Sequence, residues 1–179
     1  DLKASADRRR TLLRYGRGLA AIEALTEASW TIPYSSRVDS ITNYQHTRVE
    51  GDDLIVEDLV SDADNLTASD LERIAGIALS EPMLINRLIS PSGHVSGINV
   101  NLLLPGQSQH EVPEVAAFAR ELANDIRRHY PGIGIHLTGA LMVDNGFGEI
   151  TADDMSTLVP LMFLVLVIIT GIALRSVSG

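Results

Sequence analysis

The stretch that decides the fold class is MSTLVPLMFLVLVIITGIAL, residues 155–174. Its 20 residues carry no charge and are mainly Leu, Val, Ile, Met and Phe. A helix of this length rises about 30 Å, the thickness of the hydrocarbon core of a bilayer. The stretch has no polar face at any helical period, which favours lipid over a soluble core as its surroundings. We therefore expect a transmembrane helix from Met155 to Leu174.

The charges beside this stretch predict its orientation. Asp153 and Asp154 precede it and Arg175 follows it, so the positive-inside rule places the C-terminal end in the cytoplasm. Residues 1–154 are then extracytoplasmic, and residues 175–179 begin a cytoplasmic loop.

Composition narrows the possible functions of the rest of the chain. The 179 residues include 14 Lys and Arg against 23 Asp and Glu, a net charge of -9, with 4% aromatic residues and no cysteine. This balance disfavours nucleic acid as a partner. The lack of cysteine excludes disulfides, thiolate metal sites and thiol catalysis.

The charge is unevenly distributed. Basic residues crowd the start of the chain, whereas Glu50 to Glu81 contains ten acids and only Arg73, so we expect two oppositely charged, solvated surfaces. The basic residues are Lys3, Arg8, Arg9, Arg10, Arg14 and Arg17. Because the chain starts at Asp1 without a leader, we expect it to be a piece of a longer polypeptide.

Hydrophobic periodicity, caps and turns predict an α+β arrangement of elements. The expected elements are a helix ending before Pro33, a strand at 38–42, a strand at 54–60, a helix capped by Thr67 and Asp70, a hairpin over 84–104 turning at 91–94, a helix from Pro113 to Pro131, and a strand at 133–137. With about 44–86 taken as an insertion, this order is a ferredoxin-like β-α-β-β-α-β unit whose first strand is missing.

No catalytic or cofactor motif is present. The chain has no G-x-S-x-G, no phosphate-binding glycine loop, and Lys3 as its one lysine. No two histidines have metal-ligand spacing, so we expect neither a metal site nor a cofactor, and no enzyme. The histidines are His46, His94, His110, His129 and His136.

Four carboxylates, Asp144, Glu149, Asp153 and Asp154, lie just before the apolar stretch. Acids near a span can relay protons, but acids also suit the first turns of a helix, and the second explanation is the simpler one. We expect residues 144–154 to be a helical connection to the membrane, with these four as candidate coupling residues.

Several strings, taken in order, resemble the resistance-nodulation-division (RND) superfamily, particularly its MMPL-like predicted exporters. They are VDSITN at 38–43, GDDL at 51–54, VED at 56–58, LISPSG at 88–93, INVNL at 98–102, HLTG at 136–139, residues 154–161, and ALRS at 173–176. The resemblance covers nearly the whole chain.

The resemblance implies an inner-membrane, multi-pass, proton-driven exporter of hydrophobic or lipid-like substrates. Residues 1–143 would then be its first extracytoplasmic porter domain and residues 155–174 its second span. The implied partners are the bilayer, the remaining spans and second porter domain of the same polypeptide, and the substrate; a homo-oligomer is compatible with it. Proton-relay residues would lie in later spans. The alternatives left open are a membrane-anchored sensory or binding module and a tethered enzyme.

Overall fold

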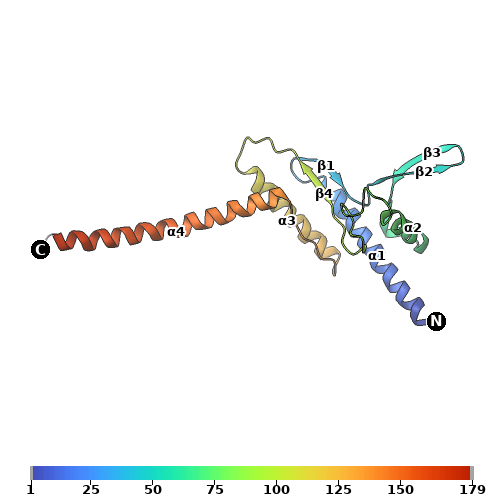
Figure 1. Ribbon diagram of the computed structural model, residues 1–179, viewed down its shortest axis with the longest axis horizontal. Coiled ribbons are helices and arrows are strands. Elements are labelled where there is room, and N and C mark those ends of the chain that lie inside the picture. Colours follow the sequence, from blue (N-terminus) through green and yellow to red (C-terminus); the bar gives the residue numbers. More distant parts are fainter. Residues whose placement is uncertain (1, 178–179) are drawn as a thin grey trace. The chain divides into compact units, whose positions relative to one another are not determined.

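The computed structural model describes the backbone of residues 2–177 and the side chains of residues 15–175 (Figure 1). The chain divides into two compact units, one running to Leu137 and one starting at Thr138. The first is an α+β unit with short strands, and the second contains one long apolar helix. The expected α+β class is therefore confirmed.

The first unit begins with helix α1, Leu2–Ser29, which ends before Pro33 as predicted. Its final turn is held by Thr26 and Ser29, whose hydroxyls donate to the carbonyls of Ile22 and Leu25, both at 2.6 Å. Leu19 lies on the buried face of the helix. Of the predicted basic surface, only the Arg17 side chain is among the described residues, and it is exposed.

Strands β1, Ser35–Asp39, and β4, Asn99–Leu102, form an antiparallel sheet with Val38 opposite Val100 (Figure 1). Val38 is 2% exposed. Helix α1 packs against both β1 and helix α3, Glu111–His129. One helix-strand-strand-helix arrangement thus joins segments that are far apart in the sequence.

The strand predicted at 38–42 is wrong in its bounds, because β1 starts at Ser35 and stops at Asp39. The chain leaves the strand where the side chain of Asn43 folds back on it. Its Oδ1 accepts from the Ser40 amide at 2.8 Å and its Nδ2 donates to the Val38 carbonyl at 2.7 Å. Such local side-chain bonds compete with a ladder, and here they end it.

A second antiparallel sheet consists of β2, Gln45–Glu50, and β3, Asp53–Asp58. The strand predicted at 54–60 corresponds to β3, whereas no strand was predicted at the position of β2. The two strands meet in a turn at Gly51, whose φ of 65° suits a residue without a Cβ. A Gly-Asp pair between two alternating runs was the signal for this hairpin.

Helix α2, Ala68–Ala78, begins at the predicted cap. The Thr67 side chain accepts from the Asp70 amide, and the Asp70 carboxylate accepts from the Thr67 amide at 3.0 Å. This reciprocal pair satisfies two amides that the first turn leaves without helical partners. The hydrogen bond from the Thr67 hydroxyl, followed by that from its backbone, lowers the pKa of Asp70.

The predicted hairpin over 84–104 is wrong in its pairing. Residues 84–90 form turns rather than a strand, with isolated bridges from Ile89 to Ile85 and Ser96. The Leu84 carbonyl accepts from the amides of Arg87, Leu88 and Ile89, which folds the segment on itself. The second predicted strand exists as β4, but its partner is β1.

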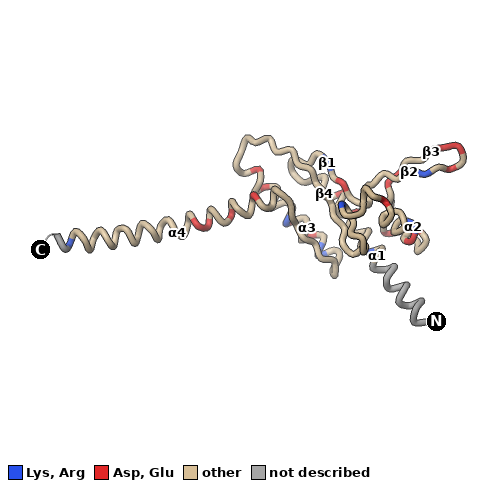
Figure 2. The backbone as a smooth tube through the Cα atoms, viewed as in Figure 1, with Lys and Arg blue, Asp and Glu red and all other residues tan. Residues whose placement is uncertain are grey.

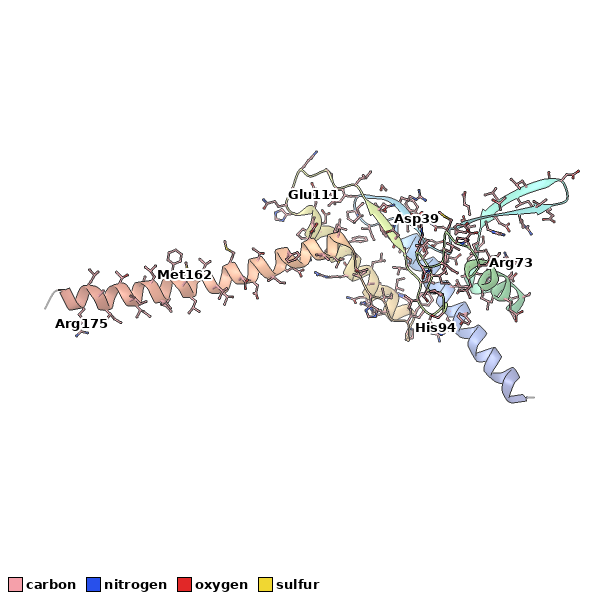
Figure 3. The ribbon with its side chains drawn as sticks, in the orientation of Figure 1. Asp39, Arg73, His94, Glu111, Met162 and Arg175 are labelled. Atoms are coloured by element: carbon pink, nitrogen blue, oxygen red, sulfur yellow. The ribbon has the colours of Figure 1, made fainter. Side chains whose placement is uncertain are left out.

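Helix α3 ends near Pro131 as predicted, and its start is set by a carboxylate that the sequence analysis missed. Glu111 is 5% exposed and accepts the amides of Gly106, Gln107 and Ser108 at 2.8, 2.8 and 2.9 Å (Figure 3). Burial raises the pKa of Glu111, yet the three backbone donors together outweigh it and hold the pKa below its ordinary value. The carboxylate thus closes the loop onto the helix.

The strand predicted at 133–137 is wrong, since these residues are not in a sheet. Ile133 and Ile135 are half-buried, and the Arg127 guanidinium donates to the carbonyl of Ile135. Alternating apolar residues form a strand only beside another strand, and none in the described part of the chain pairs with this segment. The described residues therefore do not form a complete ferredoxin-like sheet.

The main hydrophobic core lies between α1, α2 and the segments that flank the hairpin. Leu84 and Leu59 are 0% and 2% exposed, and Ile74 of α2 is 2% exposed. The core members are Leu19, Ala20, Ile41, Leu59, Val60, Ala63, Leu71, Ile74, Ala78 and Leu84. Ala63 belongs to a 3₁₀ turn, Ala63–Asn65.

Candidate membrane segment and its carboxylates

The second unit contains α4, Ala140–Val177, a helix of 38 residues. At 1.5 Å per residue it is about 57 Å long, well beyond the hydrocarbon thickness of about 30 Å. Among the described residues it is the one helix long and apolar enough to cross a membrane, with a mean hydropathy of 2.7 in its most apolar window. Both 144–154 and 155–174 belong to it.

The C-terminal half of α4 is apolar all round. Its large side chains from Leu161 to Leu174 are 48–67% exposed, and none of the apolar window is buried inside the protein. Met162 projects from this half (Figure 3). A helix in the core of a soluble protein buries at least one face, whereas no face of this window is buried.

Pro160 lies inside α4, and the helix continues through it. The proline has no amide hydrogen, so the helix lacks the bond that residue 160 would donate to the Ser156 carbonyl. Proline is tolerated in spans where such groups find other partners.

The four predicted coupling carboxylates all lie in the N-terminal part of α4. Helical geometry places Glu149 and Asp153, four residues apart, within about 40° of each other on one face. Asp144 and Asp154 lie elsewhere around the helix and are separated by about 15 Å along it. The four therefore do not converge.

Among these carboxylates, Glu149 has a defined local partner: Asn145 Nδ2 donates to its Oε1 at 2.8 Å. No group of three His, Asp or Glu side chains able to hold a metal exists among the described residues. The arrangement is that of an acidic helical segment that leads into an apolar one.

One cluster of buried hydroxyls in the first unit has structural hydrogen-bond partners. Ser40 and Thr42, which are 1% and 3% exposed, bond to each other at 2.8 Å, and the Thr42 hydroxyl donates to that of Thr26 at 3.3 Å. These hydroxyls saturate one another instead of facing a base. Sequence analysis did not identify this cluster.

Tyr34 links the start of β1 to α3. Its hydroxyl donates to Glu114 Oε2 at 3.3 Å, and its φ of 64° is left-handed. Burial, and then the Glu114 carboxylate, raises the pKa of Tyr34. The phenol therefore stays protonated and acts as a donor at neutral pH.

A shallow polar depression of about 290 Å³ lies where β3, the 3₁₀ turn and α2 meet. Its lining includes Glu57, Asp62, Asp70 and Arg73. The Asp62 carboxylate accepts a hydrogen bond from the Asn65 side chain, and the Asp70 carboxylate belongs to the cap of α2. Two carboxylates that line the depression therefore have structural partners. The depression contains no catalytic pair.

No family model, curated protein or solved structure matches the chain.

Proposed function

We propose that this chain is part of a proton-driven RND-type exporter, in which the first unit is a porter domain and α4 is its membrane anchor. The observation that carries the proposal is the combination of an α+β unit with a directly following helix whose C-terminal half is apolar on every face. The protein would lie in the inner membrane, with its first unit outside and further spans elsewhere in the polypeptide.

The sheet pairing supports a ferredoxin-like unit. In such a unit the central helix-strand-strand-helix segment brings its two strands together antiparallel, with both helices on one face. β1 and β4 pair antiparallel, and α1 packs against α3. An additional strand would then lie between β4 and residues 133–137, which would explain why the latter have no partner.

The continuity of α4 supports a role in coupling. A single helix that runs from Ala140 to Val177 would link movement at one end to the other, because the chain between them has no loop. Residues 144–154 would carry movement of the porter domain into the span. Protons would move through other spans, so Asp153 and Asp154 are positioning groups in this proposal.

The test is efflux of the hydrophobic dye Nile red from cells that produce the full-length protein. Ile150→Pro should reduce efflux by about tenfold or more while the protein remains in the membrane, since proline in a helix interior breaks its bonding. Ile150→Leu is the matched control and should retain efflux. Unchanged efflux by the proline variant would contradict the coupling.

A second arm separates the exporter from a sensory or binding module. Collapse of the proton gradient with an uncoupler should stop dye efflux by the wild-type protein. Efflux that persists, or a wild type that moves no dye, would favour an anchored binding module.

A further inference from the structure

The hairpin formed by β2 and β3 has one mainly apolar face and one charged face. Opposite residues in an antiparallel pair share a face, and successive residues alternate. Val49 lies opposite Leu54, and Thr47 lies opposite Val56, so these four residues form one face. The sequence analysis placed this region in an insertion at about 44–86 and expected its acidic residues to be solvated.

The apolar face is uncovered. Val49, Leu54 and Val56 are 74%, 68% and 53% exposed. Three neighbouring apolar side chains at the end of a two-stranded sheet are unusual, because a hairpin of this size is only marginally stable unless its apolar face packs on something. The three side chains form one contiguous apolar patch, which is typical of a surface that contacts a partner.

The opposite face is charged and internally bonded. Arg48 lies between Glu50 and Glu57, with its nitrogens 3.4 and 3.2 Å from their carboxylate oxygens. These ion pairs use the one arginine of the hairpin. They fix which face is polar and leave Val49 and Leu54 on the other.

The hairpin carries excess negative charge at its tip. Five carboxylates stand against one arginine between Gln45 and Asp58, and Asp52 and Asp53 have no basic neighbour in the hairpin sequence (Figure 2). An acidic tip is repelled by anionic lipid headgroups and by an identical acidic tip. It is attracted to arginine or lysine on another protein.

We propose that the β2–β3 hairpin is a docking element whose apolar face, Val49, Leu54 and Val56, packs on a protein surface that presents apolar side chains bordered by arginine or lysine. The apolar contact would supply affinity, and the acidic tip would supply orientation and a faster encounter. The inference does not depend on transport, since it rests on the hairpin alone.

The test uses the full-length protein in the membranes of its own host, with the photo-crosslinker p-benzoylphenylalanine in place of Leu54. We expect a protein adduct whose crosslinked peptide, identified by mass spectrometry, carries basic residues beside apolar ones. The same crosslinker at Ile55, on the charged face, is the matched control and should give several-fold less adduct. An adduct to lipid, to a second copy of the chain, or to a peptide without basic residues would overturn the proposal, as would no adduct.

Two further variants separate the apolar and charged contributions. Val49→Thr with Val56→Thr keeps β-branched side chains, so the hairpin should remain folded while the Leu54 adduct falls several-fold. Asp52→Asn with Asp53→Asn leaves the Arg48 ion pairs intact and should reduce the adduct at low salt but little at high salt. An adduct that neither double variant changes would contradict the proposed chemistry.

Discussion

Helix α3 and residues 155–174 of α4 have nearly the same length, yet they expose opposite kinds of surface. α3 has 19 residues and buries Val115, Ala116, Ala123 and Ile126 along one face, with polar residues on the other. The α4 segment exposes apolar side chains on every side. The difference lies in the surroundings that each surface suits: water on one side and a protein core on the other for α3, and an apolar solvent on every side for the α4 segment.

The largest expected effect comes from placing a charge on the apolar segment. Leu166→Arg should disfavour membrane insertion of α4 by about 2.5–3.5 kcal/mol. Ala117→Arg on the exposed face of α3 is the matched control and should change the free energy of unfolding by less than about 0.5 kcal/mol. The inserted fraction, measured by glycosylation mapping, tests the comparison; equal insertion of wild type and Leu166→Arg would break it.

The next effect separates the protein core from the exposed apolar surface of α4. Leu84→Ala removes a fully buried side chain and should destabilise the first unit by about 2–5 kcal/mol. Leu164→Ala, on α4, should leave that unfolding unchanged. Trp30 is the one tryptophan of the chain, so its fluorescence in urea reports on the first unit. Equal losses in both variants would mean that the two regions share a core.

Acid should weaken the start of α3 without affecting the apolar segment. The pKa of Glu111 is lowered from 4.5 in the folded state, so its stabilising contribution is complete above that value and is lost as pH falls through the lower, folded pKa. Glu111→Gln should be less stable than wild type at neutral pH, and the gap should narrow in acid. A pH-independent gap in the thermal midpoint would argue against a role for the carboxylate charge.

The smallest effect concerns the cap of α2. Thr67→Ala should cost about 1 kcal/mol and speed amide exchange in the first turn of the helix, because Asp70 loses its reciprocal partner. Thr67→Ser retains the hydroxyl and should restore most of the protection. Full protection in the alanine variant would show that tertiary packing, rather than the cap, fixes where α2 begins.

Features determined by neighbours in sequence could be predicted. The cap at Thr67 and Asp70, the end of α1 before Pro33, and the uncharged segment 155–174 each depend on spacing within a few turns of helix. These local signals predicted the end of α1, the start of α2 and the end of α3 close to their observed positions, and the apolar segment lies inside the longer helix α4.

Features determined by distant neighbours could not be predicted. The strand that contains Val100 could pair with the nearby apolar run at 84–90 or with the distant β1, and its own sequence does not decide between them. In the structure, residues 84–89 form a turn around the Leu84 carbonyl, so the strand pairs with β1. Burial of Glu111 depends on a loop that brings three amides to one carboxylate. Residues 133–137 alternate like a strand, but pairing needs a neighbour that local sequence does not supply.

The candidate carboxylates were identified by their position in the sequence alone. Which of them lie on the same face could be determined only from the observed helix. Their proximity to the apolar segment was readable from the sequence, whereas the sharing of one face by Glu149 and Asp153 follows from the unbroken helical phase of α4. The apolar face of the hairpin could be identified only from the register of β2 against β3.

The most direct test of the central claim is cysteine accessibility in intact spheroplasts, with any cysteine outside these 179 cysteine-free residues replaced by serine. Full-length proteins with Ser61→Cys, Thr151→Cys or Leu166→Cys are treated with a membrane-impermeant maleimide. Cysteines at 61 and 151 should react from outside, and a cysteine at 166 should react only after detergent is added. Rapid reaction at 166 in intact membranes would contradict a membrane-spanning α4, and reaction at 61 only after lysis would contradict its orientation.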